Sequence, residues 1–220
     1  MNRLLTIFVL FNLLISSNLK EGSSGKSPSE LKLEIPKGAI PINYRNHIYI
    51  TGLLDSVSGN FVFDTGADNL YIDTLFYKQH NFHYENLVQA TIPGAGNGVQ
   101  HIQVVFEPVR FNFANCEYSS SQVPLLSLKP ILGDFADGIL GRDFFENKVL
   151  AVNYQHQYMK IYEHIDSVNT ADYTRIQCEN IKNRLYLTLK VQIDDSLEIE
   201  GGFLLLVRNF PIKIQVLVWH

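Results

Sequence analysis

The chain has 220 residues, of which 46% are hydrophobic and 18% charged, and its formal net charge is −4 at pH 7. This is an ordinary globular composition, and the length allows one large domain or one domain with a fragment of a second. The mild acidity gives no basic footprint for nucleic acid, so we predict no nucleic-acid partner.

Residues 1–18 have the pattern of a secretory signal peptide. A basic start ending at Arg3 is followed by a mostly apolar run over 4–15 and then by small polar residues. This run is short for a membrane span, although an uncleaved N-terminal anchor is the alternative. We therefore predict an exported protein, secreted or periplasmic, with a flexible linker over 19–30 and no stable membrane span in the mature chain.

Short apolar or β-branched runs separated by turn residues indicate a β-rich unit over residues 31–165. The expected strands are 31–35, 47–51, 60–63, 70–72, 100–106, a strand pair within 106–113, 148–153 and 158–162. The segments between them are expected to be a turn at 55–59, a loop or short helix over 75–85, a loop at 116–121 and a short helix at 144–147.

An acidic residue follows the apolar run Phe61-Val62-Phe63 directly, in the sequence Asp64-Thr65-Gly66-Ala67-Asp68. A carboxylate at the end of an apolar strand must be desolvated, paired or hydrogen-bonded. Thr65 supplies a hydroxyl group, and Gly66 lets the backbone approach closely because it has no Cβ. An ordinary turn is the simpler interpretation, since Asp and Gly are common in turns.

Two glycine-containing segments follow. Three glycines within 94–98 indicate a mobile hairpin tip, or else a plain glycine-rich turn. Residues 136–145 read Ala-Asp-Gly-Ile-Leu-Gly-Arg-Asp-Phe-Phe. There the glycines could simply punctuate a strand, and Arg142 and Asp143 could be a solvated pair of little energetic worth.

Together these motifs resemble those of aspartic peptidases over roughly residues 35–162. The segment Asp64–Asp68 is closest to the retropepsin type. Within 136–145, Asp-Gly-Ile-Leu-Gly is similar to pepsin-like enzymes and Gly-Arg-Asp to retropepsins. The resemblance implies an all-β fold: an acid-protease β-barrel lobe with a psi-loop and a glycine-rich flap, plus a fragment of a second lobe.

The same resemblance implies an endopeptidase that uses a carboxylate-activated water and needs no metal or organic cofactor. Its partners would be a peptide or protein substrate and, in one interpretation, a second copy of the chain. The implied roles are catalysis for Asp64, turn support for Thr65 and Gly66, a flap for Gly94, Ala95 and Gly96, and a structural pair for Asp68 and Arg142.

Residues 166–220 contain a weak internal repeat, which we interpret as a partial second lobe or an aberrant C-terminal tail. Residues 47–51 are similar to 184–188, and residues 59–64 align with 202–207. Two-lobed aspartic peptidases carry a second Asp-Thr-Gly or Asp-Ser-Gly at this point, but here no Asp occurs after Asp195.

Three interpretations of the missing carboxylate stay open. Two copies could pair about a two-fold axis, each supplying Asp64. The chain could instead be a truncated or frame-disrupted lobe, inactive, whose apolar tail over 212–219 would be an exposed strand. It could also be a module that binds extended peptides without cleaving them.

The two cysteines, Cys116 and Cys178, permit a disulfide in an exported protein, but two free thiols are at least as plausible. The seven histidines are scattered, and no Cys/His spacing indicates zinc.

Overall fold

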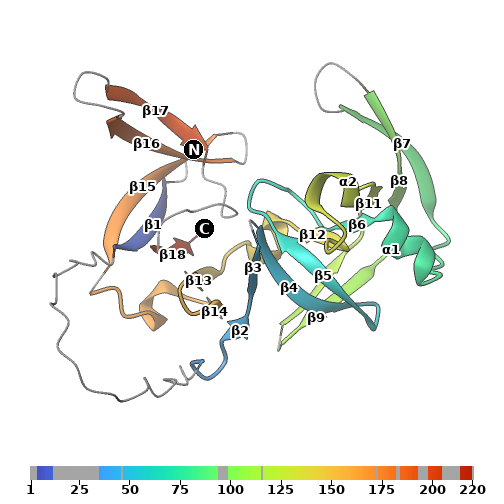
Figure 1. The fold of residues 1–220 in the computed structure, drawn as a ribbon, viewed down its shortest axis with the longest axis horizontal. Helices are drawn as coiled ribbons and strands as arrows, with labels where there is room; N and C mark the ends of the chain where they lie inside the picture. The colour runs from blue at the N-terminus through green and yellow to red at the C-terminus, as the bar shows by residue number, and fades with distance from the viewer. Residues whose placement is uncertain are drawn as a thin grey trace, which may run out of the picture.

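The computed structural model describes residues 4–11, 35–45, 47–93, 99–114, 116–171, 173–181, 184–192, 198–204 and 214–219. Nearly all the regular structure in these segments is β-strand, arranged in one ten-stranded and one eight-stranded sheet (Figure 1). The predicted all-β fold class is confirmed.

The ten-stranded sheet has the order β10-β9-β4-β5-β12-β6-β11-β8-β7, with β3 paired to β4 outside this path. Its strands are β3 (Asn43–Arg45), β4 (His47–Leu54), β5 (Val57–Phe63), β6 (Tyr71–Asp73), β7 (Leu87–Pro93), β8 (Val99–Val105), β9 (Val109–Phe113), β10 (Cys116–Ser120), β11 (Val123–Leu126) and β12 (Gly138–Leu140). Three short helices follow strands of this sheet: α1 (Thr74–Gln79) follows β6, α2 (Lys129–Leu132) follows β11, and the 3-10 helix η1 (Arg142–Phe145) follows β12.

The eight-stranded sheet has the order β17-β16-β15-β1-β18-β13-β14-β2. Its strands are β1 (Leu4–Phe11), β2 (Ile40–Pro41), β13 (Val149–Asn153), β14 (Tyr158–Tyr162), β15 (Thr174–Ile181), β16 (Arg184–Gln192), β17 (Glu198–Leu204) and β18 (Ile214–Trp219). A further 3-10 helix, η2 (Ile165–Ser167), joins β14 to the segment before β15.

The β4–β5 hairpin is the framework on which the acidic turn is built. Leu54 pairs with Val57, so the loop consists of Asp55 and Ser56, which have positive φ values of 42° and 76°. Two-residue loops of this kind match the twist of the paired strands. The turn is therefore shorter than the predicted 55–59, and β4 extends further than the predicted strand.

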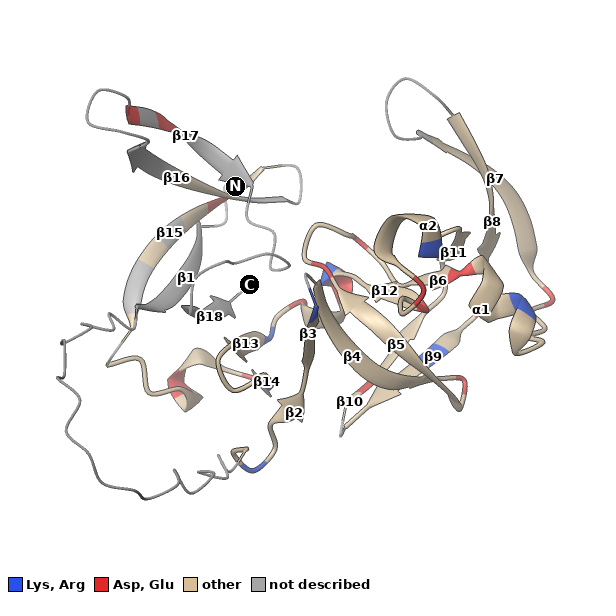
Figure 2. Ribbon diagram, in the orientation of Figure 1, with Lys and Arg blue, Asp and Glu red and all other residues tan. Residues whose placement is uncertain are grey.

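The core of the ten-stranded sheet is aromatic. Phe61, Phe63 and Phe111 are completely buried, and the rings of Phe61 and Phe111 meet edge to face with centroids 4.6 Å apart. Full burial of such a side chain contributes about 1.5–3 kcal/mol relative to leaving it exposed. Along the ribbon of this unit, basic and acidic residues are interspersed (Figure 2).

The eight-stranded sheet joins the predicted lobe to the C-terminal segment. β13 pairs with β14 on one side and with β18 on the other, so the sheet continues past the boundary predicted at residue 165. The apolar tail over 212–219, which the truncated-lobe interpretation would leave exposed, contains β18, which is paired along both edges with β1 and β13. β1 lies inside the predicted signal peptide, whose removal during export stays a prediction.

Residues 116–121 differ from the expected loop. Residues Cys116 to Ser120 form β10, an edge strand that pairs with β9 along its length. Its side chains alternate between half-buried and exposed, and the exposed positions are the polar Glu117 and Ser119. Polar edge strands have a weak sequence signal, and here the pairing with β9 decides the conformation. Cys116 and Cys178 are both free thiols.

Candidate functional site

Asp64 is positioned by the end of β5 and by a neighbouring strand. Phe61, Val62 and Phe63 are buried and hold the strand in the core, while Asp64 itself is half-buried. The Asp64 N–H donates to the carbonyl oxygen of Leu140 at 3.1 Å. The apolar anchor and this bond place the carboxyl group at the surface of the core, beside the end of β12.

The turn after Asp64 closes on its own carboxyl group. The Gly66 N–H donates to Asp64 Oδ1 at 2.8 Å, and the Ala67 N–H donates to the Asp64 carbonyl oxygen at 3.2 Å. Thr65 is buried between these residues, with 6% of its surface exposed. The brace predicted for its hydroxyl group stays a prediction.

β12 crosses behind this turn in a psi-shaped arrangement. It runs parallel to β5, with Ile139 opposite Val62, and antiparallel to β6, with Ile139 opposite Tyr71. The chain from β5 to β6 therefore passes over the end of β12, which lies between them. The psi-loop that the resemblance implied agrees with this topology.

Glycine is required at both ends of β12 because neighbouring backbone comes too close for a side chain. A Cβ at Gly141 would lie 2.3 Å from the carbonyl oxygen of Asn69 and 2.8 Å from that of Ala67. A Cβ at Gly138 would lie 2.5 Å from the carbonyl oxygen of Tyr71. The close approach lets the Arg142 N–H donate to the Ala67 carbonyl oxygen at 2.8 Å.

The predicted structural pair comes together on the outer side of the turn. Arg142 Nη2 lies 3.5 Å from Asp68 Oδ1, with the arginine side chain 16% and the aspartate side chain 66% exposed. An ion pair with one partner this exposed contributes little, about 0–1 kcal/mol. The backbone bonds between the two segments therefore do more to hold the turn than this pair.

The residue after Arg142, Asp143, is a second acid behind the turn; it is half-buried, unlike the solvated partner of Arg142 that the sequence offered as one interpretation. The Asp143 N–H donates to the Asp68 carbonyl oxygen at 3.2 Å, and the Tyr118 hydroxyl group donates to Asp143 Oδ2. Burial raises the pKa of Asp143 above its ordinary value, against the lowering effects of the Tyr118 hydrogen bond and the Arg142 charge. Burial, followed by this hydrogen bond, also raises the pKa of Tyr118.

A hairpin stands where the flap is predicted. β7 and β8 pair from Leu87↔Val105 to Pro93↔Val99, and the hairpin projects from the rest of the sheet (Figure 1). Gly94, Ala95 and Gly96, the predicted flap residues, lie outside the described residues. Val88 and Val99 are 49% and 71% exposed, so the hairpin presents apolar surface.

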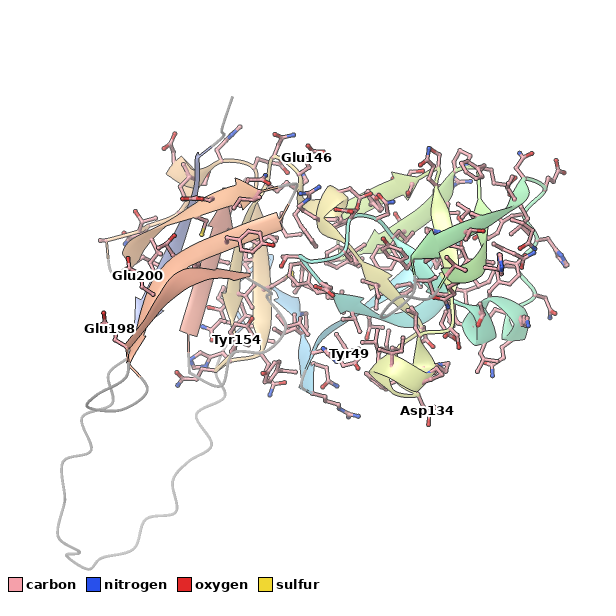
Figure 3. All side chains as sticks on the ribbon, turned by 90° about the horizontal axis from the view of Figure 1, so that it is seen from above. Tyr49, Asp134, Glu146, Tyr154, Glu198 and Glu200 are labelled. Carbon is pink, nitrogen blue, oxygen red and sulfur yellow. The ribbon has the colours of Figure 1, made fainter. Side chains whose placement is uncertain are left out.

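The C-terminal repeat also forms a hairpin. β16 and β17 pair in antiparallel register with Thr188 opposite Gly202, whereas in the β4–β5 hairpin Thr51 lies opposite Asn60 and Gly59 opposite Gly52. Figure 3 shows Glu198 and Glu200 on the outer part of β17, pointing away from the sheet. The repeat places the counterpart of the acidic turn within residues 205–213. This segment contains no Asp and lies outside the described residues.

Asp73 is a buried acid that sequence reasoning missed. Its Oδ1 accepts from the N–H groups of Leu75 and Phe76 at the start of α1, at 2.9 and 3.1 Å. Its Oδ2 accepts from the N–H groups of Leu128 and Lys129 at the start of α2, at 2.9 and 3.3 Å. The first half of this arrangement is an N-cap, which Asp before a helix could have indicated.

We expect Asp73→Ala to lower the free energy of unfolding by about 2 kcal/mol, because it leaves up to four N–H groups without their acceptor. Chemical denaturation monitored by tryptophan fluorescence and circular dichroism measures the change. Asp134→Ala is the control, since Asp134 points into solvent at the surface (Figure 3). Equal stability of the two variants would contradict a joining role for Asp73.

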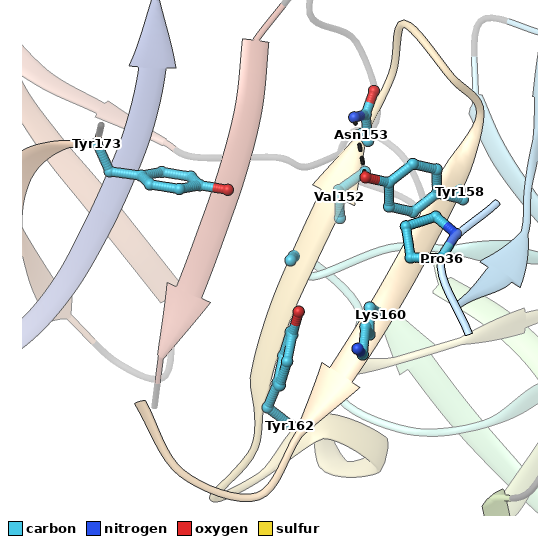
Figure 4. A pocket seen from close by; sticks show the side chains of 8 residues that line it. Pro36, Val152, Asn153, Tyr158, Lys160, Tyr162 and Tyr173 are labelled. Atoms are coloured by element: carbon cyan, nitrogen blue, oxygen red, sulfur yellow. Dashed lines mark hydrogen bonds between the residues drawn. The ribbon is translucent and has the colours of Figure 1, made fainter. Parts of the chain in front are cut away.

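A small pocket lies on the eight-stranded sheet, away from the acidic turn. Its volume is about 80 Å³, and its lining comes from β13, β14, Pro36 and Tyr173 (Figure 4). Lys160 and Tyr162 lie on one side of it and the Tyr158 hydroxyl group accepts from Asn153 on the other. None of the predicted site residues lines this pocket.

The described part of the chain contains neither a metal-ligand cluster nor a membrane-spanning helix. No group of three or more His, Cys, Asp or Glu side chains there could hold a metal ion. No helix in the same segments is both long and apolar enough to cross a membrane.

No family model matches the chain, and no curated protein does. Among solved structures the chain is similar to a retropepsin-like aspartic protease from Rickettsia conorii, with 18% identity and a TM-score of 0.42 over 56% of this chain and 89% of that one. It is also similar to the EIAV protease complexed with the inhibitor HBY-793, with 21% identity and a TM-score of 0.36 over 46% of this chain and 86% of that one. Both identities are low, and the chemistry proposed for this chain rests on its own residues.

Proposed function

We propose that this chain is an aspartic-type endopeptidase lobe in which Asp64 supplies one of two catalytic carboxylates. The observation that carries the proposal is the Asp64 turn. A half-buried carboxyl group at the end of an apolar strand accepts from the Gly66 N–H at 2.8 Å, and its backbone is bonded to Leu140 of the crossing strand β12 at 3.1 Å.

The chemistry requires that the carboxyl group be rigid and asymmetric. Oδ1 of Asp64 accepts from the Gly66 N–H, which holds the carboxyl group in one orientation, and this group would take a proton from a water molecule. Two carboxyl groups close together cannot both ionise, so one acts as base and the other as acid; aspartic proteases are the standard example of this behaviour. The water then attacks the peptide carbonyl carbon while the acid protonates the carbonyl oxygen.

The second carboxyl group is proposed to come from Asp64 of a second copy. The sequence contains one Asp-Thr-Gly, and no Asp occurs after Asp195 to replace it. A two-fold axis beside the turn brings two identical turns together through the same surface of each copy. The substrate would be an extended peptide lying between the two turns and the β7–β8 hairpins. Export from the cytoplasm is proposed on the pattern of residues 1–18.

The concentration dependence of cleavage tests the dimer. We expect the purified chain to cleave a peptide library between acidic and neutral pH, with a rate that rises as the square of chain concentration when dilute. Sedimentation over the same range should show a monomer–dimer equilibrium. A chain that sediments as a monomer and yields no product at any pH would remove this proposal.

A second candidate function is peptide binding without cleavage, and the place of β7 favours it. Among the described strands, β7 is the last of the ten-stranded sheet and pairs with β8 alone, so its outer edge is open there to an extended peptide. Peptides add to such an edge through main-chain hydrogen bonds. In this case peptides should still bind when Asp64 is replaced, and no product should form. Detectable turnover by the unmodified chain rules the candidate out.

A further inference from the structure

Asp143 joins the acidic turn to the rest of the lobe through its main chain. It belongs to η1, which begins where β12 ends. The N–H groups of Arg142 and Asp143 donate to the carbonyl oxygens of Ala67 and Asp68, at 2.8 and 3.2 Å. Any shift of η1 therefore moves the segment that immediately follows Asp64, Thr65 and Gly66.

The side chain of Asp143 is poorly suited to carrying a charge. The Tyr118 hydroxyl group donates to Oδ2, but Oδ1 is buried and has no hydrogen-bond partner. Burying a charged oxygen without a hydrogen-bond partner carries a large free-energy cost of desolvation. The neutral acid has a smaller desolvation cost, so burial in the folded state favours the protonated form of Asp143.

The surrounding groups do not remove this preference. Arg142 is the cation on the same helix, and it is also paired with Asp68 of the turn. Tyr118 reaches the carboxyl group from β10, and Tyr71 of β6 has its pKa raised by burial and by the negative charges of Asp68 and Asp143. The Tyr118 hydroxyl group, the backbone N–H groups of Phe144 and Asp143 and the Arg142 charge all favour the ionised form, yet burial keeps the pKa of Asp143 above its ordinary value.

We propose that Asp143 is a positioning residue for the Asp64 turn and acts through its proton: the neutral acid keeps η1 packed against the turn, and the ionised form loosens it. Tyr118 limits the effect, because its hydroxyl group is the one donor that stabilises the ionised carboxylate from outside η1. The consequence for peptide cleavage rests on the proposed function; the effect on the turn does not.

The direction of the pH dependence follows from the raised pKa. A carboxyl group with a higher pKa in the folded than in the unfolded state adds stability that is fully present below the unfolded value. That stability is lost as the pH rises through the folded value. The turn should therefore be held most firmly in acid and should loosen toward neutral pH.

The test compares the full chain with Asp143→Asn, an isostere of the neutral acid. Thermal unfolding is followed from about pH 3 to about pH 8, across the ordinary and raised carboxyl range. We expect the two Tm curves to coincide at the acid end and the unmodified chain to fall below the variant as the pH rises. Each unit of difference in pKa corresponds to about 3–5 °C for a chain of this size.

Hydrogen exchange at the turn separates positioning from general stability. Exchange of the Arg142 and Asp143 amides is corrected for its intrinsic pH dependence. In the unmodified chain their protection should fall with rising pH about tenfold per unit of pKa difference. In Asp143→Asn protection at the Arg142 amide and the residue-143 amide should stay constant. Parallel Tm and protection curves for the two proteins would overturn the proposal.

Two further variants complete the test. Asp134→Asn removes a solvent-exposed carboxylate and should follow the unmodified chain at every pH. Tyr118→Phe removes the outside donor and so raises the folded-state pKa of Asp143 further. Its fall in Tm should therefore extend to higher pH and be larger than in the unmodified chain; a fall of unchanged extent contradicts the proposal even if Asp143→Asn does not fold. Absence of peptide cleavage in all variants would contradict the proposed function and leave these measurements intact.

Discussion

Asp64→Asn is expected to abolish peptide cleavage by this chain, with a loss of at least about 100- to 10,000-fold. An amide cannot take a proton from water at any accessible pH, whereas its oxygen can still accept from the Gly66 N–H that now bonds Oδ1. The variant should therefore unfold at nearly the same temperature as the unmodified chain. Cleavage of a fluorogenic peptide library, measured beside a melting curve, checks both expectations.

Asp134→Asn is the matched control for this experiment. It makes the same chemical change at an exposed position on the same lobe, so cleavage should be unaffected (Figure 3). Cleavage that persists in Asp64→Asn would show that another residue carries the chemistry. A large drop in Tm would show instead that the carboxylate of Asp64 serves the fold.

Gly141→Ala should cost about 3 kcal/mol of unfolding free energy, toward the upper end for overpacking. The new Cβ would lie 2.3 Å from the Asn69 carbonyl oxygen, 2.7 Å from the Asn69 nitrogen and 2.8 Å from the Ala67 carbonyl oxygen. All three are backbone atoms of the acidic turn, which cannot rotate away as a side chain would. Relief requires that β12 and the turn separate, so any cleavage activity should fall with stability.

Gly201→Ala is the control for Gly141→Ala. Gly201 lies in β17, and a Cβ there would meet nothing within 4 Å. Its effect on unfolding should stay within about 0.5 kcal/mol. Urea denaturation of both variants measures the difference. Equal stabilities would mean that β12 does not press on the turn as described.

The parts of the candidate site that could be predicted share a local signal. Asp64, Thr65 and Gly66 are adjacent in sequence, and the bond from Gly66 to Asp64 spans two residues. The apolar run before them and the glycines of 136–145 report burial and close approach, which are properties of single positions. Local patterns of this kind can be recognised in a sequence because each position requires a particular residue type for a steric or solvation reason.

The residues that were missed act through partners far along the chain. Tyr118 reaches Asp143 across 25 positions, and Asp73 reaches Leu128 across 55. Neither Asp73 nor Tyr118 stands out from its neighbours in sequence. β10 was predicted as a loop for the same reason, since its polar residues become a strand only by pairing with β9.

The all-β class, the strand that delivers Asp64 and the glycine beside it could be predicted, because they depend on hydropathy alternation and on residues without a Cβ. That β12 lies between β5 and β6, and that β18 pairs between β1 and β13, was learned from the fold. It alone placed the carboxyl group of Asp143 behind the turn with one oxygen unpaired. Strand order and the burial of a polar atom depend on which distant segments of the chain come into contact. The residues that make such contacts follow no fixed spacing in the sequence.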